Sequence, residues 1–337
     1  KMMSSKIPVL STTVMRGVLV SKFGDPDVLE VRRDLPIPKT QANEVLVKVA
    51  AVGVNPVDTY IRAGKYARLP NLPYVPGNDM CGTVVFAGAD VTSIKEGDRV
   101  ASFMHVKSGA YAEYCVVNAD WLVRLPENFD FLKGAAVGTP YFTAYRALFT
   151  KAKATPSDIV LVHGASGGVG VAACQFAISQ GITVYGTAGS EEGMKVVRSA
   201  GAKDAFNHRE EGYTAKIMKA TGGKGPDIII EMLSNVNLNK DLEMLAPRGK
   251  IVIVGCRGPI EINPRLLMGK ESCIEGVGLF ATPQEDFSNM SKIITAGLKQ
   301  GWLDPAIGVQ FSLNSVQQAH KELIHNKGSK GKMVLIL

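Results

Sequence analysis

The chain has 337 residues, of which 46% are hydrophobic and 20% charged, and its formal net charge is +7. These values are typical of a globular protein of about two domains and exclude an intrinsically disordered chain. The longest apolar runs have the length of strands, so no segment is predicted to span a membrane and no membrane partner is expected.

The positive charge is compatible with a polyanionic partner. However, the sequence contains no block of five lysines or arginines and no nucleic-acid-binding motif, which favours a basic enzyme that binds a phosphate-rich small molecule. The cysteines are scattered singly, form no CxxC pair and are odd in number, so we expect a reducing, cytoplasmic environment. They are Cys81, Cys115, Cys174, Cys256 and Cys273.

Residues 1–13 are interpreted as a loose leader. Arg16 interrupts the apolar patch near the amino terminus, and no small-residue cleavage pattern follows it, which argues against a secretion signal.

Residues 14–125 are rich in valine, glycine and proline, with turn signals every 8–15 residues. This texture predicts a mostly antiparallel β domain. Its strand-like runs are "VMRGVLV", "EVLVKVAAVGV", "CGTVVFAG", "DRVASF" and "YAEYCVV".

From about residue 130 to residue 300 the pattern changes to strand, glycine turn and helix, which predicts a parallel sheet with helices on both faces. The predicted strands are 158–163, 182–187, 227–232, 250–255 and 273–279, and the predicted helices are 168–180, 191–200, 210–221 and 237–246. The final segment, "GKMVLIL", is predicted as a strand that could pair within either domain.

A glycine-rich turn follows the first of these strands. The stretch from Ala165 to Gly170 reads ASGGVG, a variant of the dinucleotide-binding fingerprint with alanine in the place of the first glycine. Gly167 would let the backbone approach a diphosphate, and Gly170 would let the following helix pack closely on the strand. The free N–H groups at the start of that helix are expected to bind the diphosphate.

The end of the second strand favours NADPH as the cofactor. Enzymes that use NAD place an acidic residue there to bind the ribose 2′-hydroxyl, whereas this chain has the small residues 186–190. Small residues leave room for a 2′-phosphate. The candidates for pairing with that phosphate are His208 and Arg209, which follow a third short strand, although both could equally be solvated loop residues.

Several motifs in order along nearly the whole chain make it resemble the zinc-independent quinone oxidoreductases, the zeta-crystallin branch of the medium-chain dehydrogenase/reductase superfamily. The motifs are "VNPVDTYIRAGKY", "LPYVPGNDMCGTV", "GDRV", "SGAYAEY", "GTPYFTAYRAL", "VLVHGASGGVG", "FNHRE" and "GKMVLIL". The resemblance implies an α/β fold: a Rossmann doubly wound parallel sheet at residues 139–304 and a mostly β, GroES-like catalytic domain at residues 14–138 and 305–337.

The resemblance also bears on metal binding. The superfamily's alcohol dehydrogenases hold a catalytic zinc through cysteine and histidine, but this chain has Asn55 and Asn78 at the corresponding motif positions. Neutral amides are poor zinc ligands, so no metal site is expected. Without a Lewis acid the reaction requires a good hydride acceptor, such as a quinone, or an activated enone or 2-alkenal.

By resemblance, the site would lie in the cleft between the domains, at the carboxyl ends of the parallel strands. Catalytic roles are predicted for Tyr60, Asn55 and Thr139, and removal of the Tyr60 hydroxyl is expected to slow turnover without abolishing it. The predicted cofactor-binding residues are Tyr60, Ser166, Gly167, Gly168, Val169, Gly189, His208, Asn237, Val254, Gly255, Cys256, Arg257, Val277, Gly278 and Leu279.

The resemblance thus implies a zinc-independent NADPH:quinone oxidoreductase that acts on ortho-quinones, gives semiquinones and assembles as a homodimer or homotetramer. One alternative is an NADPH-dependent reductase of 2-alkenals or enones. Another is a non-catalytic, crystallin-like protein that binds NADPH or mRNA.

Overall fold

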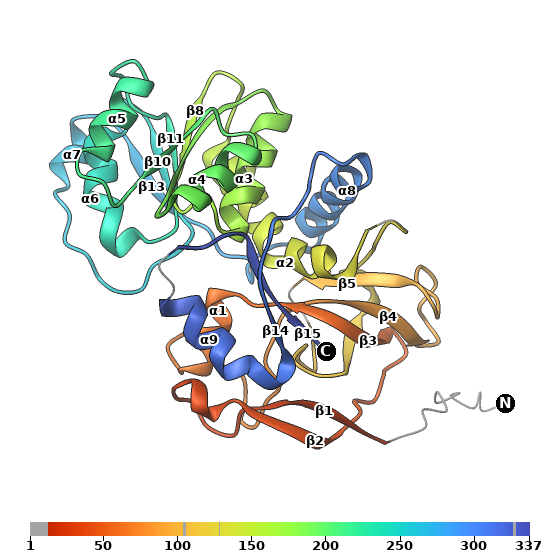
Figure 1. The fold of residues 1–337 in the computed structure, drawn as a ribbon. Helices are drawn as coiled ribbons and strands as arrows, with labels where there is room; N and C mark the ends of the chain where they lie inside the picture. Colours follow the sequence, from red (N-terminus) through yellow and green to blue (C-terminus); the bar gives the residue numbers. More distant parts are fainter. Residues whose placement is uncertain (1–12, 104–105, 128, 326–327) are drawn as a thin grey trace. The chain divides into compact units, whose positions relative to one another are not determined.

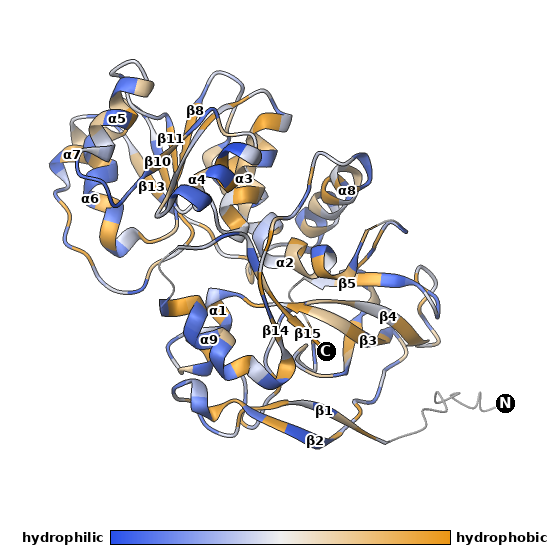
Figure 2. Cartoon of the chain, in the orientation of Figure 1, coloured by the Kyte–Doolittle hydropathy of each residue, from blue (hydrophilic) through white to orange (hydrophobic). Residues whose placement is uncertain are grey.

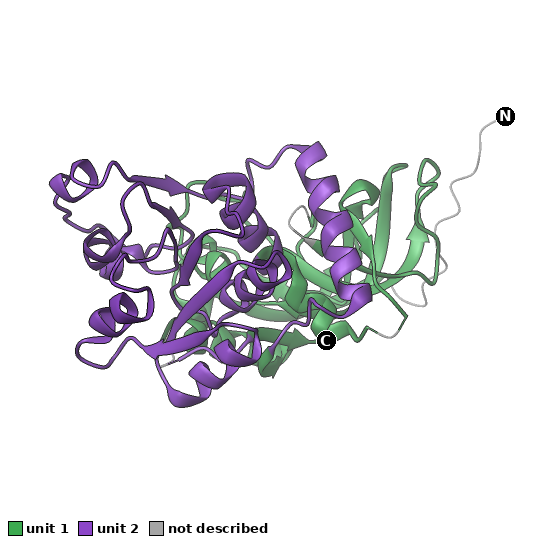
Figure 3. Ribbon diagram, turned by 90° about the horizontal axis from the view of Figure 1, so that it is seen from above, with its two compact units in different colours: residues 1–139, 307–326, 332–337 green, residues 140–306, 327–331 purple. Residues whose placement is uncertain are grey.

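The computed structural model describes residues 13–103, 106–127, 129–325 and 328–337, and the chain divides into two compact units (Figure 3). Unit 1 comprises residues up to 139 together with 307–326 and 332–337, and unit 2 comprises residues 140–306 and 327–331. The sequence predicted divisions after residues 138 and 304, and it did not predict the return of residues 327–331 to unit 2. The predicted leader, apart from Thr13, lies outside the described residues.

The main sheet of unit 1 has the order β14-β15-β3-β4-β5-β7, and β6 also pairs with β3 (Figure 1). All of these pairs are antiparallel except β14 with β15, so the domain is mostly antiparallel, as predicted. The strands of this sheet are β3 (Glu44–Gly53), β4 (Asp79–Ala87), β5 (Arg99–Phe103), β6 (Tyr114–Asn118), β7 (Leu122–Arg124), β14 (Ile307–Ser312) and β15 (Lys332–Ile336). A separate antiparallel pair is formed by β1 (Val14–Leu19) and β2 (Glu30–Pro36).

The final strand, β15, resolves an open question of the sequence, because it pairs with β3 and β14 of unit 1. Valines of β3 and side chains of β15 are buried in the same hydrophobic core. The helices of this unit include α1 (Pro56–Arg62) and α9 (Val316–His325) and the short 3-10 helices η1 (Pro26–Val28), η2 (Ala119–Trp121) and η4 (Leu313–Ser315).

Unit 2 contains a parallel sheet with the order β10-β9-β8-β11-β12-β13. Numbered along the chain, this order is 3-2-1-4-5-6, that of a Rossmann dinucleotide-binding sheet. The strands are β8 (Ile159–Val162), β9 (Thr183–Ala188), β10 (Asp204–Asn207), β11 (Ile228–Glu231), β12 (Lys250–Ile253) and β13 (Cys273–Gly276). Apolar residues run through β8 and β11, as expected of strands that helices cover on both faces (Figure 2).

The helices lie on both sides of this sheet, with α3 and α4 on one side and α5, α6 and α7 on the other (Figure 1). The helices of the chain from residue 131 to residue 300 are α2 (Phe131–Tyr145), the π-helix η3 (Arg146–Ala152), α3 (Gly168–Ser179), α4 (Glu191–Ser199), α5 (Tyr213–Ala220), α6 (Ser234–Met244), α7 (Arg265–Met268) and α8 (Gln284–Gln300). Among the described residues, no helix combines the length and apolarity that crossing a membrane requires.

Several predicted bounds in unit 2 require correction. The helix predicted at 210–221 begins at Tyr213, and the strand predicted at 250–255 ends at Ile253. The helix predicted at 237–246 begins at Ser234, because the Glu231 carboxylate accepts the N–H of Leu233 and so supports a helix start among residues that favour turns. The strand predicted at 273–279 ends at Gly276, so Val277, Gly278 and Leu279 follow the strand instead of belonging to it.

Candidate functional site

The glycine turn connects β8 to α3 and is half-buried at Gly167 and Gly168. Gly167 stands at the N-cap of α3 without a side-chain cap, so the first N–H groups of the helix are not satisfied by a capping side chain. A Cβ on Gly167 would make ordinary van der Waals contacts, at 3.4 Å from the carbonyl oxygen of Gly164 and 3.6 Å from Ser329 Oγ. A Cβ on Gly170 would instead lie 2.4 Å from the Cα of Ala165. Gly170 therefore permits the packing of helix on strand, whereas the packing of the protein does not require glycine at position 167.

A segment that the sequence did not indicate lies along this turn. The N–H of Gly331 donates to the carbonyl of Ser166 at 2.7 Å, and Gly331 forms a parallel bridge with Gly167. The same segment carries Lys330, whose Nζ lies 3.9 Å from Glu192 Oε2. Gly331 begins the motif GKMVLIL, but that motif predicted only a strand, and the sequence gave no sign that the residues before the strand lie along the glycine turn.

Two basic side chains lie beside the backbone at the end of β9, where a phosphate could bind. A Cβ on Gly189 would come within 3.0 Å of both His208 Nε2 and Arg209 Nε, which shows that these two side chains approach the same bare backbone. Burial and the charges of His163 and Arg209 lower the pKa of His208, so the ring is mostly neutral at pH 7 and can act as a hydrogen-bond donor through one ring nitrogen. The carboxylates Glu191 and Glu192 follow at the first turn of α4, after the Ser190 cap.

The remaining predicted cofactor residues of unit 2 also follow strand ends. Asn237 lies on α6 after β11, and the N–H groups of Val254 and Gly255, which follow β12, donate to the carbonyl of Glu231 at 2.8 and 3.2 Å. Cys256 and Arg257 are exposed next to them, and residues 277–279 follow β13. The structure thus brings the predicted residues from all six strand ends to the carboxyl edge of one sheet, where ligands of open α/β sheets bind.

A group of polar side chains at this edge, which we call the histidine cluster, contains His163, Thr187, Glu231, Asn237 and Asp241. Of these the sequence analysis identified only Asn237 as a site residue, and it missed the three titratable members, which are buried. His163 Nε2 lies 2.8 Å from Asp241 Oδ1 and 3.7 Å from Glu231 Oε2, and both carboxylates are fully buried. The Asn237 amide donates to both carboxylate oxygens of Glu231, at 3.2 and 3.3 Å.

Among the described residues, His163, Glu231 and Asp241 also form the one group of three side chains spaced to hold a metal ion. His163 Nε2 and Asp241 Oδ1 are 2.8 Å apart, the distance of a charge-assisted hydrogen bond. A hydrogen bond between the two side chains therefore explains why they lie together without a metal ion. Burial alone would lower the pKa of His163, but the carboxylate of Asp241, with that of Glu231, outweighs burial and raises it. Burial raises the pKa of Glu231 to about 7.

The predicted catalytic residues of unit 1 meet a second buried group, the lysine cluster: Asn55, Asp58, Asp79, Thr139 and Lys332. The Asn55 amide donates to Asp79 Oδ2 at 2.8 Å, and its oxygen accepts from Lys332 Nζ. The backbone N–H of Thr139 and its hydroxyl both donate to Asp79, at 2.9 and 2.7 Å. The polar groups of Asn55 and Thr139 are therefore engaged within the cluster.

The lysine cluster also determines where α1 begins. Asn55 is the N-cap of this helix, and the Asp58 carboxylate accepts the backbone N–H of Asn55 at 2.8 Å in a capping box. The Asn78 amide donates to the other Asp58 oxygen at 3.4 Å. The two amides at the zinc-ligand motif positions, Asn55 and Asn78, therefore both donate hydrogen bonds to carboxylates. Tyr60 lies on α1, half-buried, and the catalytic roles of Tyr60, Asn55 and Thr139 remain predictions.

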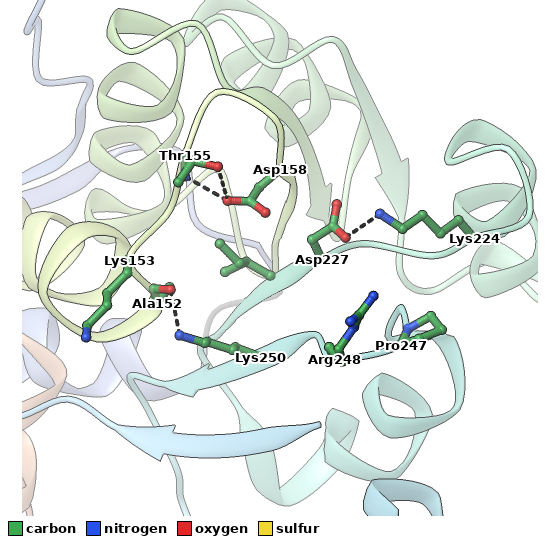
Figure 4. A pocket seen from close by; sticks show the side chains of 10 residues that line it. Ala152, Lys153, Thr155, Asp158, Lys224, Asp227, Pro247, Arg248 and Lys250 are labelled. Atoms are coloured by element: carbon green, nitrogen blue, oxygen red, sulfur yellow. Dashed lines mark hydrogen bonds and ion pairs between the residues drawn. The ribbon is translucent and has the colours of Figure 1, made fainter. Parts of the chain in front are cut away.

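A pocket of about 560 Å³ lies at the opposite, amino-terminal edge of the sheet of unit 2 (Figure 4). Its acidic groups are paired, since Asp227 contacts Lys224 at 2.6 Å and Asp158 accepts from Thr155 at 2.7 Å. Lys250 donates to the carbonyl of Ala152, the last residue of η3, at 3.1 Å. Lys224 is thus paired with a carboxylate and Lys250 with the end of a helix. We therefore do not assign the nucleotide to this pocket.

Comparisons with known proteins agree with this geometry. Residues 41–127 match the alcohol dehydrogenase GroES-like domain, and residues 168–296 match the zinc-binding dehydrogenase family. The chain is 51% identical over 324 residues to a quinone oxidoreductase of Homo sapiens, covering 96% of this chain and 98% of the relative, and 50% identical to that of Rattus norvegicus with the same coverage.

Solved structures give the same result. A quinone oxidoreductase of Escherichia coli complexed with NADPH is similar with a TM-score of 0.86 at 29% identity, covering 96% of this chain and all of that one. A mycobacterial protein complexed with NADPH is similar with a TM-score of 0.87 at 30% identity and the same coverage.

Proposed function

The chain belongs to the quinone oxidoreductases of the medium-chain dehydrogenase/reductase superfamily, and on that premise we propose that it transfers reducing equivalents from NADPH to quinones. The observation that carries the proposal is a Rossmann strand order with an uncapped glycine turn at the carboxyl edge of the sheet, in a chain that shares half of its residues with curated quinone oxidoreductases.

The residues present fit NADPH. The uncapped start of α3 offers N–H groups to a diphosphate, and Gly167, at the N-cap, has no side chain to obstruct its approach to the backbone. His208 and Arg209 approach the backbone of Gly189, where a ribose 2′-phosphate would require positive charge or donors. When bound, NADPH supplies the reducing equivalents, and the chain holds it in place.

For the acceptor half, we propose that Tyr60 donates a hydrogen bond to a reduced oxygen. The amides of Asn55 and Asn78, which occupy the zinc-ligand motif positions, are poor metal ligands and are already engaged with Lys332, Asp79 and Asp58. We therefore propose zinc-independent chemistry, in which catalysis rests mainly on holding the donor close to an easily reduced acceptor.

An absorbance assay of NADPH oxidation tests this function. The purified chain should consume NADPH with an ortho-quinone, much less with a 2-alkenal, and not reduce NADP⁺ with an alcohol, and a chelator should change none of these rates. A preference for the alkenal would replace the proposal with double-bond reduction. Tight NADPH binding without turnover of either acceptor would favour a non-catalytic binding protein.

The choice of NADPH over NADH has its own test. Arg209→Gln should raise the Kd for NADPH about tenfold to a hundredfold, because a hydrogen bond to a charged group contributes about 1.5–3 kcal/mol. The Kd for NADH, which lacks the 2′-phosphate, should stay within a factor of about two. Equal losses for both cofactors would place Arg209 outside the phosphate pocket. The matched control is Arg198→Gln, a partly exposed arginine of α4 that pairs with Asp204.

We further propose that the protein works in the cytoplasm as a homodimer or homotetramer. The described cysteines are all free thiols, in keeping with a reducing compartment. The mass of the assembly in solution tests the subunit number.

A secondary mRNA-binding role is proposed from the net charge of +7. If it exists, RNA affinity should fall steeply with salt.

A further inference from the structure

Glu231 occupies the topological switch point of the sheet in unit 2. It is the last residue of β11, beside β8 in the sheet order, and ligands of doubly wound sheets bind at the carboxyl ends of the strands on either side of this point. Its side chain is fully buried. A buried carboxylate is costly unless hydrogen bonds or charges compensate it, so its presence calls for an explanation.

The hydrogen bonds of Glu231 connect it to three segments of the proposed nucleotide site. Its carboxylate accepts from Leu233 N and from the Asn237 amide, whose nitrogen lies 3.2 and 3.3 Å from its two oxygens. Its backbone carbonyl accepts from Val254 and Gly255 at 2.8 and 3.2 Å. The loop after β11, the first turn of α6 and the loop after β12 are therefore all tied to one residue.

The other side of the histidine cluster reaches the glycine turn. His163, which directly precedes the turn, lies 3.1 Å from Thr187 Oγ1, and this hydroxyl also accepts the N–H of Gly164 at 3.2 Å. One oxygen of Asp241, Oδ2, is buried without a hydrogen-bond partner among the described residues. The cluster thus contains two carboxylates for a single histidine, and its charge is not fully compensated.

We propose that Glu231 is a positioning residue of the nucleotide site, and that NADPH and NADP⁺ bind most tightly when its carboxylate is ionised. This inference rests on the proposed function, because it takes Asn237 as a contact of the cofactor. An ionised Glu231 offers acceptors on both oxygens and binds the nitrogen of the Asn237 amide. The oxygen of that amide then remains for the proposed contact with the cofactor. Protonation converts one of these two acceptors into a donor and so weakens the hold on the amide.

The sign of the pH dependence follows from the groups around Glu231. Burial raises its pKa to about 7, His163 from the end of β8 opposes that shift, and Asp241 of α6 adds to it. The other titratable groups near the cluster are Tyr213 of α5, whose pKa burial and these carboxylates raise, and His208 after β10. If the nucleotide prefers the ionised form, binding must release protons near pH 7, and affinity must weaken as the pH falls below 7.

Calorimetric titration of NADP⁺ into the protein, in two buffers of different ionisation enthalpy, measures this proton release. We expect release of a fraction of a proton per site at pH 7 and almost none at pH 8.5. In Glu231→Gln, which mimics the protonated form, release at pH 7 should be strongly reduced, and the Kd at pH 8.5 should rise about tenfold. The Kd of this variant should change much less with pH between 6 and 8.5 than that of the wild type.

The matched control is Glu243→Gln, an exposed glutamate on the same helix, which should keep both the proton release and the affinity of the wild type. His208 and the 2′-phosphate titrate in all variants and so form a common background. If Glu231→Gln does not fold, Asn237→Ala serves instead, because it removes the link between Glu231 and the cofactor and should also suppress the release.

Wild-type protein that binds NADP⁺ at pH 7 without releasing protons, or a folded Glu231→Gln with undiminished release, would overturn this inference. Quinone-dependent NADPH oxidation at pH 8.5, where Glu231 is ionised, is measured alongside. Turnover without Glu231-dependent release would refute this inference alone. Absence of NADP⁺ binding at every pH would refute the proposed function together with it.

Discussion

The lysine cluster of unit 1 and the histidine cluster of unit 2 bury similar charges in different surroundings. Each contains two carboxylates and one basic side chain, Asp58 and Asp79 with Lys332 in one and Glu231 and Asp241 with His163 in the other. In each, burial raises the pKa of one carboxyl, to about 6 for Asp58 and about 7 for Glu231.

The two clusters differ in their basic residue, lysine or histidine, and in the segments that their hydrogen bonds join. Burial lowers the pKa of Lys332, but Asp79 and Asp58 oppose that shift, and lysine starts from a far higher value than histidine. In the lysine cluster the Nζ of Lys332 lies 3.7 Å from Asp79 Oδ2, and the bonds of the cluster join β15, β4 and the start of α1. In the histidine cluster burial raises the pKa of Glu231 to about 7, and the bonds of the cluster end in the loops of the nucleotide site. Similar charges thus support the fold in one unit and are proposed to support binding in the other.

Removing the cation of the lysine cluster should have the largest effect. Lys332→Met leaves the carboxylates of Asp79 and Asp58 buried without a positive partner, so unit 1 should lose about 3–5 kcal/mol of unfolding free energy. Each unit contains one tryptophan, Trp121 in unit 1 and Trp302 in unit 2. Urea unfolding followed by Trp121 fluorescence, in a Trp302→Phe background, reports unit 1 specifically.

Two further variants make that experiment decisive. Lys330→Met removes an exposed lysine whose ion pair with Glu192 is weak, and it should change stability by less than about 1 kcal/mol. Adding Asp79→Asn to Lys332→Met should recover part of the loss, because it removes one of the unpaired charges. A Lys332→Met protein as stable as the wild type would mean that the lysine cluster does not depend on its cation, and the comparison with the histidine cluster would fail.

Two glycines of the turn between β8 and α3, Gly167 and Gly170, are expected to have different roles, one in nucleotide binding and the other in stability. A Cβ on Gly170 would lie 2.4 Å from Ala165 Cα and 2.6 Å from the Gly164 oxygen, so Gly170→Ala should cost about 1–3 kcal/mol, read from Trp302 fluorescence. A Cβ on Gly167 would make only ordinary contacts, the nearest at 3.4 Å from the Gly164 oxygen, and its φ of −83° suits alanine. Gly167→Ala should therefore keep its stability and bind NADP⁺ about tenfold more weakly, a change of about 1.4 kcal/mol. The reverse pattern would exchange the two assigned roles.

The sequence allowed the prediction of the Rossmann sheet and the glycine turn because both depend on local patterns. The apolar runs of β8 and β11 and the ASGGVG stretch are each legible within a few residues. Helix α8 was not predicted, although Phe287, Met290, Ile294 and Leu298 form a buried stripe at helical spacing. That stripe is a local pattern, so the sequence alone is sufficient to predict this helix.

The two clusters could not be predicted for a different reason. His163 and Asp241 stand 78 positions apart, and Asn55 and Lys332 stand 277 apart, so only the folded sheets bring them together. In the sequence His163 stands at the end of one apolar run, and Glu231 stands within another, between Ile230 and Met232. A single polar residue after a buried strand is a weak signal, but at a switch point of the strand order it merits attention.

The smallest expected effect concerns Asp58 and the pH dependence of stability. Since its pKa rises from 3.8 to about 6 on folding, the native state favours the protonated form, and the stability this gives is lost as the pH rises through about 6. In Asp58→Asn the loss of unfolding free energy that this carboxyl contributes between pH 4 and pH 6 should disappear, a difference from the wild type of about 1–2 kcal/mol across that range, followed by Trp121 fluorescence. The exposed Asp90→Asn should keep the wild-type slope. An unchanged slope in Asp58→Asn would show that the second carboxylate of the lysine cluster carries its charge without cost, unlike Glu231.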